Sequence, residues 1–351
     1  MRFDFHGVTV EVASRDAEAL RFLRANFSLQ EVEDAAAGEP RADVTLVVEP
    51  ESAGRFDVAP RGHRRLFRTK DAVVTRRAGA QLFESAGRAA VLYDFRIERG
   101  VVYGPDRDLA LEKCYLLITS RVGALLDRRG LHRVHAMGVA VGDAALLCAF
   151  PMGGGKTTLA LDMLLRDAGV GGASDATRPR TALLSDDCPL VDFAGCAHPF
   201  AVRIGVNPGG EPAEIPDAMR LAFPRSRHGP KTLLDARYFA DRIAPRSRVR
   251  VFAYGRRADR AAPVAHRRSR LAGLRVLWSA GVLGAGLPEL LEYTVPCSIG
   301  GALELVRVRL SRLRAMLALA RGAAIYELVL GTDRTANAAL VRGLLDAEAR
   351  A

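Results

Sequence analysis

The stretch that most constrains this chain is AFPMGGGKTTLA, residues 149–160, in which three glycines precede a lysine and two threonines. An apolar run typical of a buried strand, AALLCAF, comes before it, and the helix-like LALDMLL follows. A glycine-rich turn between a strand and a helix lets backbone N–H groups converge on one point at the helix N-terminus. The sequence therefore predicts a phosphate-binding loop in an α/β nucleotide-binding core.

The loop departs from the usual G-x-x-x-x-G-K-[ST] pattern at its first position, where Phe150 replaces glycine. Pro151 follows, and proline has no N–H to donate. We therefore expect the first half of the loop to be stiff and to contact the nucleotide base or the core. The phosphate and nucleotide contacts are predicted for the rest of the loop: Met152, Gly153, Gly154, Gly155, Lys156, Thr157 and Thr158.

A second strand-like run, TALLS, ends in two adjacent acids, Asp186 and Asp187. Neighbouring carboxylates at a strand end repel each other unless a cation lies between them. We expect Thr157 and one or both aspartates to bind Mg²⁺, with Lys156 on the outer phosphates. One aspartate would hold the metal and the other would accept a proton from an attacking hydroxyl. The sequence leaves open which of them does which.

Three further residues could belong to the functional site, but each could also have an ordinary structural role. His135 could orient a nucleophile or bind phosphate, or it could be a core histidine, whereas His132 is expected to be structural or exposed. Arg203, expected on a strand after the aspartates, could meet the transferred phosphate or lie on the surface. Lys231 is one of only four lysines among 51 basic residues, which favours a position that needs a compact ammonium, in contact with substrate or phosphate.

The order of strand and helix patterns divides the chain into three segments. Residues 1–128 read as an N-terminal α+β domain for partner binding or assembly, with strands expected at 3–12 and 42–48 and helices at 16–27 and 109–128. Residues 129–265 contain the predicted nucleotide-binding core, with a polar, mobile excursion expected at 167–180. Residues 266–351 are expected to be mainly helical and packed on the core, apart from a strand at 325–331.

Composition narrows the class of protein. The formal charge is +11, and ten arginines but one acid occupy residues 246–275. This segment is either a solvated, partly helical surface or a docking face for an acidic or phosphorylated partner. Nucleic acid is not expected there, because few aromatic residues for base stacking are interleaved with the charges. Five scattered cysteines and no apolar run of about 18 residues are typical of a cytoplasmic protein that does not enter a membrane.

Three stretches together resemble a known nucleotide-binding core: VHAMGVAV, ALLCAFPMGGGKTTLALDMLL and ALLSDDCPLVD. They are similar to the P-loop core that HPr kinase/phosphorylase and phosphoenolpyruvate carboxykinase share. The sequence pattern A-F-P-x-x-x-G-K-T is especially similar to that of GTP-dependent carboxykinases, which also lack the first glycine. The paired Asp186 and Asp187 resemble the D-D of both families, and His135 resembles a histidine of HPr kinases. The resemblance covers about residues 131–205.

The resemblance implies an α/β P-loop fold of the HPr kinase C-terminal type, with an N-terminal α+β domain and helical C-terminal additions. It implies a kinase that uses ATP or GTP with Mg²⁺ and transfers the γ-phosphate to a hydroxyl, foremost a serine of an acidic peptide or small protein. Two alternatives stay open: a nucleotide-binding switch or assembly protein without transfer activity, and a small-molecule kinase. A homo-oligomer is also open, since HPr kinases are hexamers.

Overall fold

A computed structural model describes residues 1–33, 41–50, 64–69, 72–77, 80–166, 179–223 and 229–350 of the chain. Of the polar excursion expected at 167–180, residues 167–178 lie outside the described residues. The chain divides into two compact units. The first combines residues 1–126, 205–235 and 288–305, and the second combines 127–204, 236–287 and 306–351. Both units therefore contain segments that lie far apart in the sequence.

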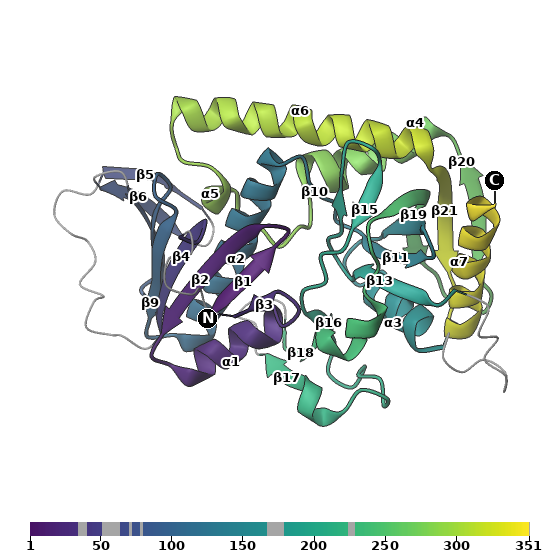
Figure 1. The fold of residues 1–351 in the computed structure, drawn as a ribbon, viewed down its shortest axis with the longest axis horizontal. Coiled ribbons are helices and arrows are strands. Elements are labelled where there is room, and N and C mark those ends of the chain that lie inside the picture. The colour runs from purple at the N-terminus through teal and green to yellow at the C-terminus, as the bar shows by residue number, and fades with distance from the viewer. Residues whose placement is uncertain are drawn as a thin grey trace. The chain divides into compact units, whose positions relative to one another are not determined.

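The first unit is built on a mixed sheet. Among the described residues nine strands form it in the order β3-β1-β2-β4-β9-β8-β7-β6-β5 (Figure 1). Their bounds are β1 (Arg2–Phe5), β2 (Val8–Ser14), β3 (Glu31–Val32), β4 (Val44–Pro50), β5 (Arg64–Arg68), β6 (Val73–Arg77), β7 (Ala80–Ser85), β8 (Ala89–Asp94) and β9 (Arg99–Gly104). The helices α1 (Ala17–Asn26) and α2 (Arg107–Arg128) confirm the two helices predicted here. The segment 205–235 adds the small sheet of β16 (Ile204–Val206), β18 (Lys231–Leu234) and β17 (Arg220–Phe223).

The single strand predicted at 3–12 is wrong, because β1 and β2 form an antiparallel hairpin there. His6 and Gly7 connect them, and both have a positive φ, of 55° and 80°. Two consecutive left-handed residues make the tight turn whose twist matches paired strands. The alternating pattern continues across the turn, so it did not reveal the reversal of the chain.

The second unit contains the other large sheet, in the order β10-β14-β15-β19-β12-β11-β13, with β21 beside β19 and β20 beside β21. Its strands are β10 (His132–Arg133), β11 (Met137–Val141), β12 (Ala144–Ala149), β13 (Thr181–Ser185), β14 (Leu190–Val191), β15 (Cys196–His198), β19 (Ser247–Arg257), β20 (Val264–Arg268) and β21 (Ala324–Leu330). β12, β19 and β21 run parallel, whereas β11 is antiparallel to both β12 and β13. The mixed α/β class predicted from the sequence is therefore confirmed.

Both faces of this sheet are buried, which gives the unit three layers. Met137, Leu146 and other residues of one face pack against α3 (Lys156–Arg166) and α7 (Arg334–Ala349). Alternate residues such as Leu147 and Phe252 face the side covered by α4 (Arg270–Leu277), η4 (Trp278–Leu283) and the C-terminal half of α6 (Ile299–Gly322) (Figure 1). Burial on both faces explains why the strand sequences are continuous apolar runs and do not alternate between apolar and polar residues.

The arginine-rich segment 246–275 consists mainly of β-strands, whereas one of the two alternatives expected for it was a solvated, partly helical surface. Most of it forms β19 and β20, and α4 begins at Arg270. In β19 the arginines alternate with buried residues such as Val249 and Val251, so apolar side chains fix the strand in the core while arginines point outward. The remaining short helices are η2 (Asp217–Met219), η3 (Ala236–Arg242) and α5 (Leu291–Thr294). Within the described ranges, no helix is long and apolar enough to cross a membrane.

Candidate active site

The glycine loop connects the end of β12 with the start of α3. Gly153 and Gly155 have φ values of 75° and 94°, which side chains rarely tolerate. Gly154 is required for a different reason, because a Cβ there would lie 2.8 Å from Phe150 Cβ and 2.9 Å from the Pro151 carbonyl oxygen. The Gly154 N–H also donates to that carbonyl at 2.9 Å, which closes a turn. The loop conformation is therefore specific to the glycines that the sequence places there.

The first half of the loop contacts the core, one of the two alternatives predicted for it. The Phe150 side chain is buried in the apolar layer between the sheet, α3 and α7. The next two residues are exposed, and Met152 is 80% exposed. Met152 can therefore meet a ligand at the surface of the unit, whereas Phe150 cannot.

Lys156, the first residue of α3, is buried and turns back toward the loop. Its Nζ donates to the Phe150 carbonyl oxygen at 2.8 Å and lies 3.0 Å from His135 Nε2. It also lies 3.7 Å from Asp187 Oδ1. An ammonium has three N–H groups. The loop, a histidine and a carboxylate thus surround one cation at the N-terminal end of a helix.

The hydrogen bonds of His135 define the tautomer of its ring. Nδ1 lies 2.8 Å from the carbonyl oxygen of Ala285, which can only accept, so Nδ1 carries a proton. In the neutral ring Nε2 is then the acceptor, and it faces the ammonium of Lys156. Nε2 is also 3.2 Å from Asp187 Oδ1. A doubly protonated ring would donate to Asp187 but would oppose the charge of Lys156.

The two aspartates after β13 occupy different environments. Asp186 is buried, whereas the side chain of Asp187 is 40% exposed and faces His135 and Lys156. Both lie in a turn that follows Ser185, whose Oγ accepts from the N–H of Cys188 at 3.0 Å. The Asp187 carbonyl oxygen accepts from the N–H of Ala136 at 3.1 Å, which ties this turn to the chain next to His135. Asp187 is therefore the aspartate that can reach a ligand beside Lys156.

The sheet topology explains why these residues meet. Met137 pairs with Cys148, and Gly138 pairs with Ser185. The C-terminal ends of β12 and β13 and the N-terminal end of β11 consequently lie at one edge of the sheet. The glycine loop, the aspartates and His135 each adjoin one of these three ends. Ligands of open α/β sheets bind at this kind of edge, where parallel strands end.

The acids of this edge are compatible with Mg²⁺ bound together with a phosphate ligand. Within the described residues, no group of three or more His, Cys, Asp or Glu side chains is placed to hold a metal ion. Mg²⁺, however, is commonly bound by one or two carboxylates together with waters and phosphates. Asp187 has an exposed carboxylate, and Thr157 is half-buried in the first turn of α3. This donor set fits a cation that enters with a phosphate ligand.

Ala285 and Gly286 were missed by the sequence reasoning, although both position His135. A Cβ at Gly286 would lie 1.9 Å from His135 Nδ1, and φ there is +90°. The backbone thus approaches the imidazole ring so closely that only glycine fits. The segment GAG at 284–286 contains two glycines, which was the available signal, but its distance of 150 residues from His135 gave no reason to connect them.

We expect Gly286→Ala to displace the His135 ring and to destabilise the protein. The matched control is Gly142→Ala, which also has a positive φ, of 60°, but no atom within 4 Å of the added Cβ. The control should lower the free energy of unfolding by about 1–2 kcal/mol through backbone strain alone. Gly286→Ala should lower it further and should change the imidazole ¹⁵N chemical shifts of His135. Equal stability of the two variants with unchanged imidazole shifts would contradict the assignment.

The remaining residues considered in the sequence are not among the contacts of Lys156 described above. Arg203 is half-buried and immediately precedes β16 rather than lying within a strand. Lys231 begins β18 in the first unit, where its Nζ donates to the Gly205 carbonyl oxygen at 3.3 Å. Substrate contact by either residue stays a prediction. His132 is structural, since its buried ring lies 2.8 Å from Asp127 Oδ1. Burial raises the pKa of Cys188, so this thiol is not an activated nucleophile.

A scan against protein-family models found no match, and a search of curated proteins found no similar sequence.

Proposed function

We propose that this protein is a P-loop kinase of the HPr-kinase-like type, which transfers the γ-phosphate of ATP or GTP to a hydroxyl group. The observation that carries the proposal is the convergence on Lys156 of the glycine loop, His135 and Asp187. Phosphoryl transfer needs positioning and charge neutralisation, with a group that accepts the proton of the nucleophile. These residues supply each of those parts at one edge of a sheet.

The roles follow from charge, exposure and tautomer. The loop N–H groups at the α3 N-terminus and the Lys156 ammonium would bind the phosphates. Asp187, the more exposed aspartate, would accept the proton of the acceptor hydroxyl. The acceptor oxygen then bonds to the γ-phosphorus, and the bond from that phosphorus to the bridging oxygen breaks to release the nucleoside diphosphate. His135, with Nδ1 bonded to the Ala285 carbonyl, would orient Asp187 and Lys156 through Nε2.

A divalent cation belongs to this proposal. With Asp187 as the proton acceptor, Asp186 and the Thr157 hydroxyl would hold Mg²⁺, which neutralises the charge on the transferred phosphate when it is bound. Asp187 adjoins both Lys156 and His135. This position suits the proton acceptor and leaves the metal to the neighbouring carboxylate.

The acceptor proposed is a serine hydroxyl in an acidic peptide or small protein. The net charge of +11 favours an acidic partner by long-range attraction. The first unit would help to select it, and Lys231 of that unit and Arg203 of the second are candidate substrate contacts. A small-molecule kinase or a nucleotide switch would need no such partner.

The test follows the γ-phosphate of labelled ATP and GTP in the presence of Mg²⁺, with small proteins and peptides of the same cells as acceptors. Label should pass to an acceptor, and Lys156→Ala should lower the rate by at least about 10²-fold, because it removes a charged donor to the phosphates. The control is Lys113→Ala, a buried lysine of α2 in the first unit. Nucleotide binding without transfer or hydrolysis above the Lys156→Ala level would exclude a kinase and leave a switch.

A further inference from the structure

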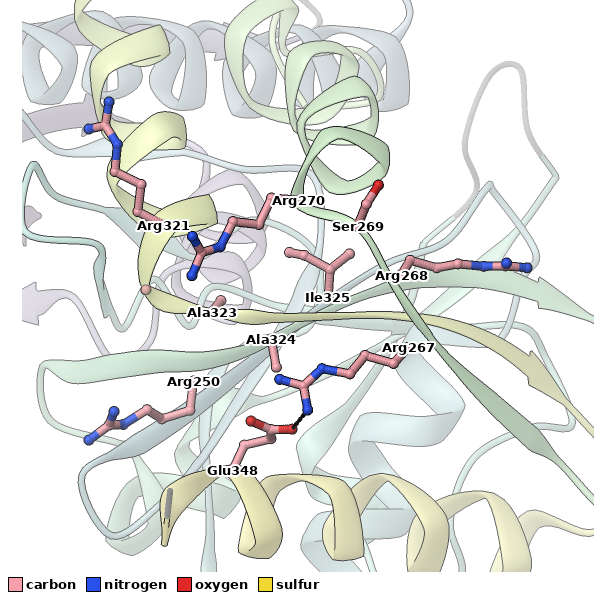
Figure 2. Close-up of a pocket in the computed structure, with 11 residues that line it drawn as sticks. Arg250, Arg267, Arg268, Ser269, Arg270, Arg321, Ala323, Ala324, Ile325 and Glu348 are labelled. Atoms are coloured by element: carbon pink, nitrogen blue, oxygen red, sulfur yellow. Dashed lines mark ion pairs between the residues drawn. The ribbon is translucent and has the colours of Figure 1, made fainter.

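A second site lies in the second unit at the other end of β21 from the glycine loop. It is a pocket of about 450 Å³ at the start of β21 (Figure 2). Five arginines from the strands β19 and β20 and the helices α4 and α6 line it: Arg250, Arg267, Arg268, Arg270 and Arg321. Leu330, at the C-terminal end of β21, adjoins the loop, since its Cδ1 would lie 3.7 Å from a Cβ added at Gly155. Six residues of extended strand between Ala324 and Leu330 correspond to about 20 Å, so the two sites are separate.

Two of the five arginines of the pocket form ion pairs with acidic residues, and three do not. Arg268 forms an ion pair with Glu327 at 2.6 Å, and Figure 2 shows it extending away from the others. Arg267 contacts Glu348 at 3.2 Å, and among the described residues Glu348 is the only acid that lines the pocket. Within the described residues, Arg250, Arg270 and Arg321 have neither a hydrogen bond nor an ion pair from their guanidinium groups. Positive charges gathered without counter-charges repel each other, and an anion would relieve that repulsion.

The lining also indicates which anion fits. The apolar residues that line the pocket are Ala323, Ala324 and Ile325. No aromatic residue of the described part of the chain lines it, so these residues offer no surface for stacking a nucleobase. Its volume is near the lower end of the range of small-molecule sites. Guanidinium groups bind phosphate through paired hydrogen bonds. A short acidic peptide carries less charge per unit volume than a pair of phosphate groups.

We propose that this pocket binds a compact anion carrying two phosphate groups, such as a pyrophosphate or a small bisphosphorylated molecule. Arg250, Arg270 and Arg321 would contact the ligand, and Arg267 would exchange its contact with Glu348 for one with phosphate. The proposal does not depend on kinase activity, because none of these residues belongs to the glycine-loop site.

Isothermal titration with inorganic pyrophosphate, without Mg²⁺, tests the proposal. The wild-type protein should bind pyrophosphate at the pocket, with weaker affinity at higher ionic strength. Arg270→Gln with Arg321→Gln should weaken this binding at least about 10-fold, because two charged hydrogen-bond donors are lost. Arg275→Gln, an exposed arginine of the same helix that does not line the pocket, should bind like the wild type. Lys156→Ala should keep the pocket site, which separates it from any binding at the loop.

Each alternative result would overturn the proposal. Equal weakening by Arg275→Gln would show a general charge effect rather than a site. Binding of a short polyglutamate peptide at the pocket, without binding of pyrophosphate, would make it a docking site for an acidic protein. Pyrophosphate binding that Lys156→Ala abolishes entirely would place it only at the loop. The single variants Arg270→Gln and Arg321→Gln, both at exposed positions, provide the comparison if the double variant is unstable.

Discussion

Replacing Asp187 with asparagine should lower the rate of γ-phosphate transfer by about 10²- to 10⁴-fold, the range typical for loss of a positioned general base. Asparagine keeps the size of the side chain but cannot accept the proton of the attacking hydroxyl. It also removes the negative charge 3.7 Å from Lys156 Nζ and 3.2 Å from His135 Nε2. Single-turnover transfer assays with saturating nucleotide measure the effect on the chemical step.

The matched control is Asp143→Asn, an exposed aspartate in the turn between β11 and β12. This turn lies at the end of those strands that is opposite to the glycine loop, so transfer should be unchanged. Nucleotide affinity of Asp187→Asn, measured separately, should fall much less than the transfer rate. A variant that keeps more than half of the wild-type rate would contradict the role given to Asp187.

Replacing Arg312 with methionine should lower the free energy of unfolding of the second unit by about 3–5 kcal/mol, because it leaves a buried charge uncompensated. The Arg312 guanidinium donates to both oxygens of Asp127, at 3.0 and 2.7 Å, and both side chains are only 1% exposed. His132 Nδ1 contacts the same carboxylate, and Ser311 Oγ contacts His132 Nε2 at 3.1 Å. Urea unfolding followed by circular dichroism measures the change.

Arg307→Met on the same helix is the matched control, since Arg307 is exposed and its replacement should change stability by less than about 0.5 kcal/mol. A double variant, Asp127→Leu with Arg312→Met, should recover much of the loss, because a well-packed apolar pair can replace a buried ion pair. Similar stabilities of Arg307→Met and Arg312→Met would show that the buried pair contributes little.

The same carboxylate makes this contribution depend on pH. Burial alone would raise the pKa of Asp127, but Arg312 and His132 outweigh it and hold this pKa below its usual value. A carboxylate whose pKa is lowered by folding stabilises the folded state above the unfolded pKa, about 4, and this contribution is lost as the pH falls toward the folded pKa. The stability difference between wild type and Arg312→Met should therefore be largest near neutral pH and should shrink below about pH 4.

Local sequence patterns were sufficient to predict most individual strands and helices of the second unit. The apolar runs at β12 and β13, the glycines between β12 and α3, and the strand β21 were each predicted from short windows, because burial and backbone conformation there depend on adjacent residues. The pattern failed where alternation crosses a turn, as between β1 and β2. It also failed in the arginine-rich β19, whose charges obscured the buried residues between them.

The amino-acid sequence by itself determined the glycine loop, its lysine and the acids that follow a strand, since glycine conformation and strand burial are local properties. Only the tertiary structure decided that Asp187 rather than Asp186 faces Lys156, and that Gly286 makes room for the ring of His135. Strand pairing brings residues 135, 156 and 187 to one sheet edge. The packing of α4 and α6 beside the sheet gathers Arg270 and Arg321 around one pocket with Arg250 of β19. Contacts between distant segments depend on which strands pair, and no short window of sequence contains that information.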